Sequence, residues 1–309
     1  MRTRDGAQNG AERSTHAALG IDVGGTKVAL RAESAAGHVE EASFAWGPSL
    51  GVDRDLARLA ACVGELTVRT GAPFRAVGVA MPATVGPDER VTAWPSRPEW
   101  TGLELGRALR GLFPAAAVAW ADDGDLAALA EAEAAHCDDL LYLGVGTGVG
   151  GGLVLGGRLC PGAGRGSFEL GHLVLELDGP TCVCGRRGCL QATASGPATL
   201  ARAAGLRGAP VTFDDLRAGL RERRPWAVTA LDRTGYALAA AATGVAELLH
   251  PRLALIGGGF AAGIPELVDR VAEHLTALAR PGLPALPVAP ARLGGLSSLR
   301  GAVLLARGR

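Results

Sequence analysis

Two stretches of the sequence decide its fold: AALGIDVGGTKVAL at residues 17–30 and LLYLGVGTGVGGGLVLGG at residues 140–157. In each of them, small turn-forming residues separate two apolar runs of strand length, which predicts a strand, a glycine turn and a second strand. Glycines let backbone N–H groups come close to a phosphate. We therefore expect one such turn in each of two domains, the two together clamping the phosphates of a nucleotide.

The first turn starts with an acidic residue, Asp22, and continues through small residues. The backbone of Gly24 and Gly25 and the hydroxyl of Thr26 offer donors to a phosphate, and Asp22 can hold Mg²⁺ through water. The turn ends on Lys27, the one lysine among 31 basic residues, which we include in the candidate site. A plain β-hairpin without a ligand explains the same pattern and remains the alternative.

The second turn matches the dinucleotide fingerprint G-x-G-x-x-G over residues 146–151. That fingerprint requires a helix to follow, whereas LVLGGRL after the glycines is typical of a strand, so an NAD-dependent oxidoreductase is disfavoured. No G-x-x-x-x-G-K-[ST] motif occurs in the chain, which excludes a P-loop protein. The candidate phosphate-binding residues of this turn are Gly146, Thr147, Gly148 and Gly150.

A third glycine turn follows the apolar run LALI near the C-terminal end of the chain. The pattern predicts a strand, a turn of three glycines and the start of a helix. Such a turn allows an adenine or a ribose to come close to the backbone, although a tight strand–helix connection without a ligand explains it as well. The residues are Gly257, Gly258 and Gly259.

Three acidic residues, Asp122, Asp123 and Asp125, fall within four positions at the start of an alanine-rich helix expected through residue 135. Acids cap the N–H groups of a helix start and interact favourably with its dipole, but one acid suffices for that. The group therefore indicates a function, with a solvated helix cap as the alternative. Upstream, a strand expected over residues 76–85 ends in residues suited to lining a pocket, Ala83 and Thr84.

Residues 169–191, ELGHLVLELDGPTCVCGRRGCLQ, contain half of the chain's six cysteines. Zinc takes four nitrogen or sulfur ligands in tetrahedral geometry, and short Cys-x-Cys spacings let one loop supply several thiolates. Four protein ligands leave no open position for a catalytic water, which indicates a structural zinc ion. The alternative is three buried thiols and a surface histidine. The expected ligands are His172, Cys182, Cys184 and Cys189.

The composition excludes several classes of protein. A length of 309 residues and 48% hydrophobic residues suffice for two domains with sizeable cores. Zero net charge argues against a nucleic-acid-binding surface, and no apolar run reaches the roughly 18 residues of a membrane span. Residues 1–16 are polar without the apolar core of a secretory signal, so we expect a disordered tail. Free thiols beside a thiolate zinc site suit a reducing cytoplasm.

Taken together, the motifs resemble those of the ROK family of sugar kinases, within the hexokinase–actin–Hsp70 fold group. The resemblance runs from about Leu19 to the C-terminus. It rests on DVGGTK at 22–27, GVGTGVGGG at 144–152, ELGH at 169–172 and CVCGRRGC at 182–189. Some members of the family are transcriptional repressors with an N-terminal helix-turn-helix domain. Because DVGGTK begins at residue 22 here, we expect an enzyme.

The resemblance implies an α/β fold of two actin-like (ribonuclease H-like) domains, each with a mixed sheet flanked by helices, with a cleft between them. We expect the first domain over residues 17–122 and the second over residues 123–295, the latter carrying the zinc loop 172–189. The last helix, within residues 296–309, is expected to pack back on the first domain. The family also implies a homodimer.

The implied activity is ATP-dependent phosphorylation of a hexose hydroxyl, usually the one on C6. Asp123 matches the family's general base, which orients the hydroxyl and accepts its proton. Glu169 and His172 match ligands of the sugar hydroxyls, so that zinc would orient His172 toward its substrate. The first two glycine turns would bind Mg²⁺ and the phosphates of ATP, and the third would lie beside the nucleoside.

Two positions depart from the family pattern: Asp122 stands where most members have asparagine, and Gln191 where most have glutamate. An amide donates and accepts hydrogen bonds, whereas a carboxylate only accepts and carries charge. Asp122 therefore predicts an ammonium group at C3 of the sugar, as in kanosamine (3-amino-3-deoxy-D-glucose), which kinases of ansamycin-type antibiotic pathways phosphorylate. Gln191 either keeps the pocket's net charge constant or marks a substrate such as a C7-cyclitol. An ordinary glucokinase and a sugar sensor without catalysis are the alternatives.

Overall fold

The structure is a computed structural model that describes residues 17–47, 51–162 and 166–308; the tail expected over residues 1–16 lies outside them. The chain divides into two compact units. The first contains the described residues up to Ala130, those within 161–167, and those from Leu296 onward. The second contains Glu131–Cys160 and Phe168–Gly295. The chain therefore crosses between the units inside an α-helix at residues 130/131, then at 160/161 and 167/168, and finally at 295/296, just before the C-terminal helix.

The first unit is built on a five-stranded sheet in the order β3-β2-β1-β4-β7. Its strands are β1 (Ala18–Val23), β2 (Lys27–Glu33), β3 (Val39–Ala45), β4 (Ala76–Ala80) and β7 (Ala117–Ala121). The first three form an antiparallel meander, whereas β4 runs parallel to β1 and β7 parallel to β4. A separate short hairpin consists of β5 (Thr84–Val85) and β6 (Val91–Ala93).

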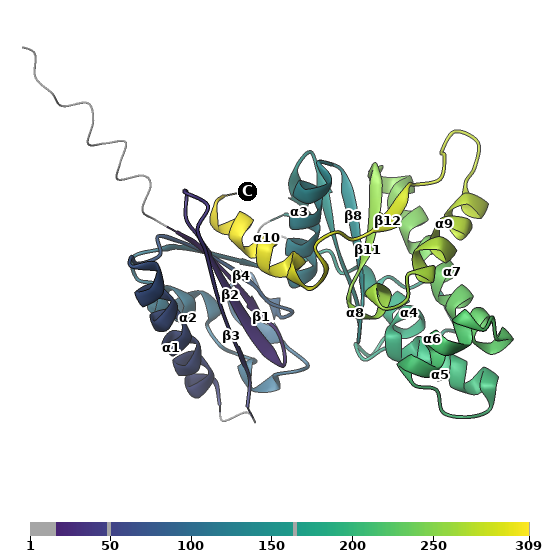
Figure 1. Ribbon diagram of the computed structural model, residues 1–309, viewed down its shortest axis with the longest axis horizontal. Coiled ribbons are helices and arrows are strands. Elements are labelled where there is room, and N and C mark those ends of the chain that lie inside the picture. The colour runs from purple at the N-terminus through teal and green to yellow at the C-terminus, as the bar shows by residue number, and fades with distance from the viewer. Residues whose placement is uncertain (1–16, 48–50, 163–165, 309) are drawn as a thin grey trace, which may run out of the picture. The chain divides into compact units, whose positions relative to one another are not determined.

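Helices cover both faces of this sheet (Figure 1). One face carries α1 (Val52–Thr70) and α2 (Leu105–Leu112), and the other carries α10 (Ser297–Ala306). Ile21 of β1 and Leu59 of α1 belong to the same buried core. On the other face, α10 comes very close to the sheet, because a Cβ atom on Gly20 or Gly78 would collide with the backbone of α10. The C-terminal helix is thus an integral layer of the first unit.

The second unit repeats this topology, with a five-stranded sheet in the order β10-β9-β8-β11-β12. Its strands are β8 (Leu140–Val145), β9 (Val149–Leu155), β10 (Arg158–Cys160), β11 (Leu253–Gly257) and β12 (Val288–Pro290). Again the first three strands form an antiparallel meander, and the last two run parallel to the first. Both predicted strand–glycine turn–strand stretches therefore occupy the same place, the connection between the first two strands of a sheet.

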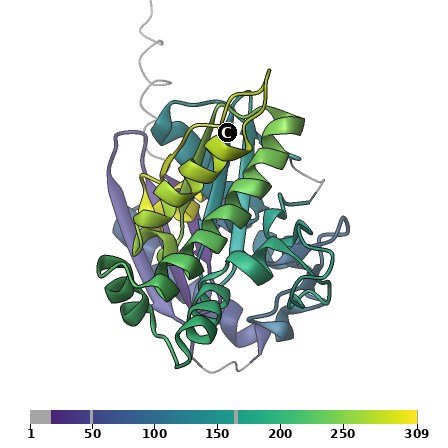
Figure 2. The same ribbon diagram turned by 90° about the vertical axis from the view of Figure 1, so that its right-hand side faces the viewer.

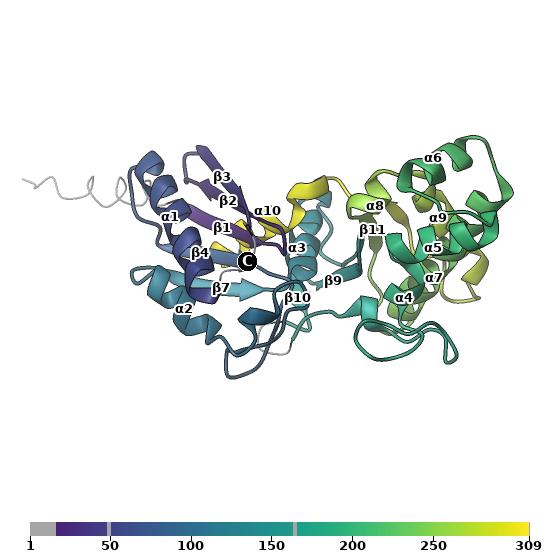
Figure 3. The same cartoon turned by 90° about the horizontal axis from the view of Figure 1, so that it is seen from below.

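Most helices of the second unit pack around α7 (Pro225–Leu249), which lies side by side with α9 (Glu266–Leu278) (Figure 2). The helices α4 (Leu190–Ala194), α5 (Gly196–Arg207) and α6 (Phe213–Arg221) contact α7 as well (Figure 3). The remaining helices are α8 (Gly259–Ala262) and α3 (Asp123–Ala135), which begins in the first unit. Neither α7 nor any other helix in the described part of the chain has the length and hydropathy of a membrane span.

The strand expected over residues 76–85 is interrupted in the structure. β4 ends at Ala80, and the next strand, β5, starts at Thr84. Pro82 lies in the gap, and proline has no backbone N–H to donate to a neighbouring strand. The single predicted strand is therefore wrong, because the apolar run continues across a residue that cannot pair.

Candidate active site

The first glycine turn joins β1 to β2 and is held from several directions. The Gly24 N–H donates to the carbonyl at the far end of the turn at 3.0 Å. Trp46 donates its indole N–H to the Gly24 carbonyl at 2.8 Å and its backbone N–H to the Thr26 carbonyl at 2.9 Å. Gly25 packs against Ser96, whose Oγ lies 2.5 Å from the place that a Cβ would take. The turn is thus fixed by Trp46 and Ser96, which follow Gly24 and Gly25 by 22 and 71 positions.

A cluster of three tryptophans and a buried ion pair supports this turn, and it was not predicted from the sequence. The Arg97 guanidinium stacks over the Trp46 ring at 4.3 Å, and its Nη1 lies 2.7 Å from Oδ2 of Asp55. The Trp100 indole N–H donates to the same Asp55 oxygen at 2.9 Å. The one available signal was local: Trp94 and Trp100 stand three residues on either side of Arg97.

Two acidic residues of the candidate site interact within the first unit, Asp22 on β1 and Asp123 at the first position of α3. Burial, together with the negative charge of Asp123, raises the pKa of Asp22 to about 7 against the opposing effect of Lys27. A bound cation relieves such repulsion, and carboxylate oxygens are ligands that Mg²⁺ prefers. The pair therefore fits a Mg²⁺ ion.

Asp122 caps the start of α3, because its Oδ1 accepts a hydrogen bond from the Gly124 N–H at 2.9 Å. From the sequence, this capping role is the alternative to a substrate role. Asparagine caps a helix as well as aspartate does, so the cap alone does not require a negative charge here. Asp125, the third acid of the group, is only 5% exposed.

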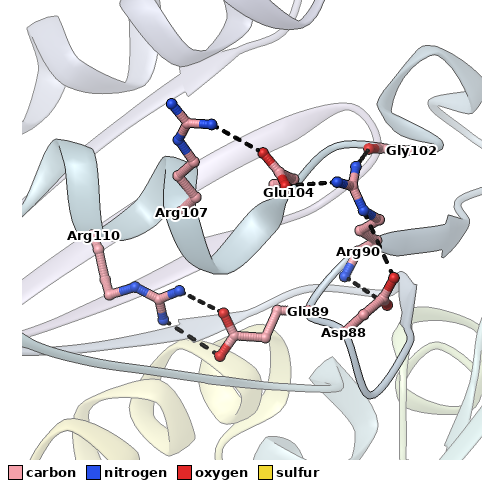
Figure 4. Close-up of polar contacts among 7 residues, drawn as sticks. All are labelled: Asp88, Glu89, Arg90, Gly102, Glu104, Arg107 and Arg110. Carbon is pink, nitrogen blue, oxygen red and sulfur yellow. Dashed lines mark hydrogen bonds and ion pairs between the residues drawn. The ribbon is translucent and has the colours of Figure 1, made fainter.

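Ala83 and Thr84 lead into the β5–β6 hairpin, which a network of exposed ion pairs fastens to α2 and to the segment before it (Figure 4). Exposed ion pairs contribute only about 0–1 kcal/mol each, so the network serves mainly to fix the position of the hairpin. In this network Arg90 binds Asp88, Glu104 and the carbonyl of Gly102, Arg107 binds Glu104, and Arg110 binds Glu89.

The second glycine turn joins β8 to β9, and Gln191 of α4 lies directly on it. Oε1 of Gln191 accepts a hydrogen bond from the Val149 N–H at 3.1 Å, and the same oxygen lies 2.5 Å from the place of a Cβ on Gly148. The Gly146 carbonyl accepts from the N–H of Gly196, the first residue of α5, at 2.9 Å. Two helices thus hold the turn, whose exposed members are Thr147 and Gly150.

The predicted sugar ligands of the second unit gather around Val149. Glu169 precedes the short 3-10 turn Leu170–His172, in which the His172 N–H donates to the Glu169 carbonyl at 3.0 Å. This turn packs on β9 so closely that a Cβ on Gly171 would collide with the Val149 carbonyl. Gln191 binds the N–H of the same residue. Glu169, His172 and Gln191 are therefore brought together although the sequence separates them by up to 22 positions.

His172 and the three cysteines form a cluster whose ligand atoms all lie within 4.8 Å of one another. The Nδ1 atom of His172 is 3.7 Å from Sγ of Cys182, and the Sγ atoms of Cys184 and Cys189 are also 3.7 Å apart. Two sulfurs bound to one tetrahedral zinc ion at about 2.3 Å stand about 3.8 Å apart, whereas a disulfide bond is about 2.05 Å long. The cluster therefore fits the predicted structural zinc ion.

The thiols of this cluster differ in their protonation. Hydrogen bonding from the Arg186 backbone lowers the pKa of Cys184 to about 6. Burial and hydrogen bonds with the neighbouring thiols raise the pKa of Cys189 to about 11. Because zinc binds thiolates, binding of the metal at neutral pH must displace a proton from Cys189.

The third glycine turn, between β11 and α8, forms part of a cavity of about 370 Å³. Gly258 has a φ of 87°, and a Cβ there would collide with the backbone of Val145, so only glycine fits. A volume of this size falls within the roughly 300–1,000 Å³ of small-molecule pockets, which fits the predicted nucleoside site. The lining also includes Gly257, Gly259, Asp269, Pro290, Ala291, Gly294 and Gly295.

Residues 18–309 match the sequence profile of the ROK family. The chain belongs to the ROK family. The kanosamine kinase of Amycolatopsis mediterranei (strain S699) is 64% identical to this chain over 288 residues, which cover 93% of this chain and 95% of that protein. The glucokinase of Thermotoga maritima is 30% identical over 78% of this chain and 81% of its own length.

A solved ROK structure agrees with the fold. The ROK hexokinase from Thermus thermophilus matches with a TM-score of 0.80 and 29% identity, over 94% of this chain and 98% of that chain. The similarities confirm the predicted family, the actin-like α/β fold, and an ATP-dependent sugar kinase that uses Mg²⁺. The roles of the individual site residues stay predictions.

Proposed function

We propose that this ROK kinase phosphorylates the 6-hydroxyl of kanosamine, 3-amino-3-deoxy-D-glucose, with ATP as the phosphoryl donor. The observation that carries the proposal is Asp122, a carboxylate directly before Asp123 at the start of α3. The 64% identity to the kanosamine kinase of Amycolatopsis mediterranei supports the same substrate for this chain. The proposed metabolic context is ansamycin-type antibiotic biosynthesis.

The negative charge of Asp122 is the property that helix capping leaves unexplained. An asparagine would accept the Gly124 N–H equally well. A carboxylate, however, forms a charge-assisted hydrogen bond with an ammonium group, worth about 1.5–3 kcal/mol. A neutral hydroxyl gains little from that charge. The difference corresponds to a preference of about ten- to hundredfold for the 3-amino sugar over glucose.

Asp123 is the proposed general base. The 6-hydroxyl donates a hydrogen bond to its carboxylate, and the proton passes to Asp123 as the sugar oxygen attacks the γ-phosphorus of ATP. A bond forms between O6 and phosphorus, the bond from phosphorus to the β–γ bridging oxygen breaks, and ADP leaves. Asp22 would hold Mg²⁺, which when bound neutralises charge on the β- and γ-phosphates.

The second unit is proposed to bind the remaining parts of both substrates. Glu169, His172 and Gln191 bind sugar hydroxyls, the turn at residues 146–151 binds phosphates, and the cavity takes the nucleoside. The Nδ1 side of His172 faces Cys182, so Nε2 is the nitrogen proposed for the sugar. Ligation of Nδ1 by zinc would fix the tautomer and the direction of the ring.

Glucose is the second candidate substrate, since the glucokinase of Thermotoga maritima is 30% identical to this chain, and a C7-cyclitol is the third. An assay in which kanosamine, glucose and glucosamine compete decides among them. We expect kcat/KM for kanosamine to exceed that for glucose by at least about tenfold. A higher kcat/KM for glucose overturns the substrate assignment, and no ADP release with any sugar indicates a sensor.

We also propose that the protein acts as a homodimer in the cytoplasm. The resemblance to the ROK family supports the homodimer. The compartment is supported by the thiols of the cysteine cluster, which are free and can bind zinc only if they stay reduced. Light scattering after gel filtration measures the mass in solution, and a monomer mass at micromolar concentration contradicts the dimer.

A further inference from the structure

Glu131 is a buried charged residue that the proposed reaction does not use. It lies on α3, eight positions after Asp123, and is 0% exposed. A carboxylate in such a place is costly unless hydrogen bonds satisfy it. Its Oε2 accepts from the Arg292 N–H at 2.8 Å and its Oε1 from the Leu293 N–H at 3.0 Å. The Arg292 side chain adds a hydrogen bond to the Ala134 carbonyl at 3.0 Å.

The segment that Glu131 binds is also a wall of the nucleoside cavity. Residues on both sides of Arg292 and Leu293 line the cavity, namely Pro290, Ala291, Gly294 and Gly295. The Ala291 N–H donates to the Ile256 carbonyl at 2.8 Å, which ties this wall to the strand that leads into the third glycine turn. A single segment, residues 290–295, therefore contacts the cavity and α3.

The helix α3 connects Glu131 to Asp123 without a break. Eight residues of α-helix span about 12 Å at about 1.5 Å per residue. The N-terminal half of α3 has its own attachment, because a Cβ on Gly301 of α10 would collide with the Leu126 carbonyl. The helix is thus held at two points, one near Asp123 and one at Glu131.

The two attachments lie on different sides of the division between the compact units. The chain changes units at residues 130/131, 160/161, 167/168 and 295/296, and the first and last of these changes concern α3 and the segment that it contacts. Leu126 and Gly301 belong to the first unit, whereas Glu131 and its backbone partners belong to the second. Glu131 is the first residue of α3 that belongs to the second unit. A constraint on residues 290–295 therefore reaches α3 at this residue.

We propose that Glu131 is a positioning residue that couples occupancy of the cavity to the helix carrying Asp123. A nucleoside in the cavity fixes the wall at residues 290–295, and the two hydrogen bonds to Glu131 pass this constraint on to α3. The general base is then held most firmly when the nucleotide is bound. This inference rests on the proposed function for the identity of the cavity's ligand.

The test compares Glu131→Gln with Glu133→Gln in the full chain. Glutamine keeps the shape of glutamate but presents one acceptor, so one of the two backbone N–H groups loses its partner. Glu133 is exposed on the same helix and undergoes the same chemical change. We expect Glu131→Gln to lower kcat about tenfold, within the range of coupling energies between sites, while the Kd for ADP changes less than threefold. Glu133→Gln should leave both unchanged.

Amide hydrogen exchange with and without ADP gives a readout that a merely structural role would not move. In the parent protein, ADP should slow exchange at residues 257–262, at residues 292–293 and in the C-terminal half of α3. In Glu131→Gln, ADP should still protect residues 257–262 but no longer α3. Equal protection of α3 in both proteins overturns the coupling while leaving the nucleoside site intact. If ADP protects none of these segments in the parent protein, the nucleoside assignment itself is wrong, and the coupling with it.

A second measurement needs no variant and applies even if Glu131→Gln does not fold. In the unmodified protein, the amides of Arg292 and Leu293 and those of the C-terminal half of α3 should gain protection together during an ADP titration, with one common midpoint. Protection that stays confined to residues 257–262, with none at residues 292–293 or in the C-terminal half of α3, contradicts the proposal.

Discussion

Gln191 accepts a hydrogen bond from the backbone N–H of Val149 at 3.1 Å, and so joins helix α4 to the glycine turn between β8 and β9. Val149 is buried, and its carbonyl side packs against Gly171 in the turn that carries Glu169 and His172. A residue that the sequence suggested only as a sugar ligand therefore also holds the backbone of the turn that is predicted to bind phosphates.

Gln191→Ala removes the acceptor of a buried N–H group, which typically costs about 1–3 kcal/mol. We expect this loss in the free energy of unfolding, together with a KM for ATP raised by about fivefold or more, because the glycine turn is no longer fixed. Urea unfolding and steady-state kinetics measure both. Gln191→Glu is the matched control, since a carboxylate still accepts from Val149; a KM for ATP that is equal in the two variants contradicts the role in the turn.

Two substitutions of Asp122 separate the effect of its negative charge from the effect of its helix-capping hydrogen bond. Asp122→Asn keeps an acceptor for the Gly124 N–H and removes the charge, so stability should change little while the kcat/KM ratio of kanosamine to glucose falls about ten- to hundredfold. Asp122→Ala removes both, and should in addition cost about 1 kcal/mol of stability. Competition assays and thermal unfolding measure the two effects. An unchanged sugar preference in Asp122→Asn removes this residue from specificity.

The acid pair Asp22–Asp123 predicts a pH dependence of stability in Mg²⁺-free protein. Folding raises the pKa of Asp22 from 3.8 to about 7, so the folded state binds the proton more tightly than the unfolded state does. The resulting stability is fully present below about pH 3.8 and is lost as the pH rises through about 7, by up to about 4 kcal/mol at about 1.36 kcal/mol per pKa unit.

Urea unfolding between pH 5 and 8.5 without added Mg²⁺ measures this dependence, and Asp22→Asn should flatten it. A chelator is unsuitable here, because it would also remove zinc. Added Mg²⁺ should stabilise the parent protein more at pH 8 than at pH 6, since only the ionised carboxylates bind it. A parent protein whose stability does not fall between pH 6 and 8 contradicts the raised pKa.

Zinc should bind once per chain and release protons as it binds. Cys189 carries its proton at neutral pH because its pKa is about 11, so the metal must displace that proton. We expect Cys189→Ser to lose zinc, to unfold at lower temperature, and to lose kinase activity because His172 is no longer oriented. Cys160→Ser, a half-buried cysteine outside the cluster, is the control. Elemental analysis that finds zinc retained in Cys189→Ser contradicts the site.

The parts of the fold that could be predicted are those whose partners are close in sequence. The glycine turns follow from runs of about a dozen residues, and the cysteine cluster from a spacing within eighteen residues, His172 to Cys189. The cap formed by Asp122 involves Gly124, two positions away. For such features, the residue types and their spacing are enough to predict the contact.

The parts that could not be predicted depend on contacts between distant segments. Asp55 meets Arg97 across 42 positions and Trp100 across 45. Glu131 meets Arg292 across 161 positions. In the sequence, Glu131 is one of several helix-forming residues in an alanine-rich helix. Nothing near it in the sequence indicates that both of its carboxylate oxygens accept hydrogen bonds. Such pairs become visible only when the topology of the sheets brings their elements together.

The place of α10 has a consequence for biosynthesis of the protein. Gly20 of β1 and Gly78 of β4 face α10. The helix, at residues 297–306, follows both strands by more than 200 positions in the sequence. The strands of the first sheet are therefore synthesised long before α10, the helix that covers one face of that sheet. That face, which includes Gly20 and Gly78, can be covered by α10 only after the whole helix has been synthesised. The first unit, although synthesised first, is the last to be completed.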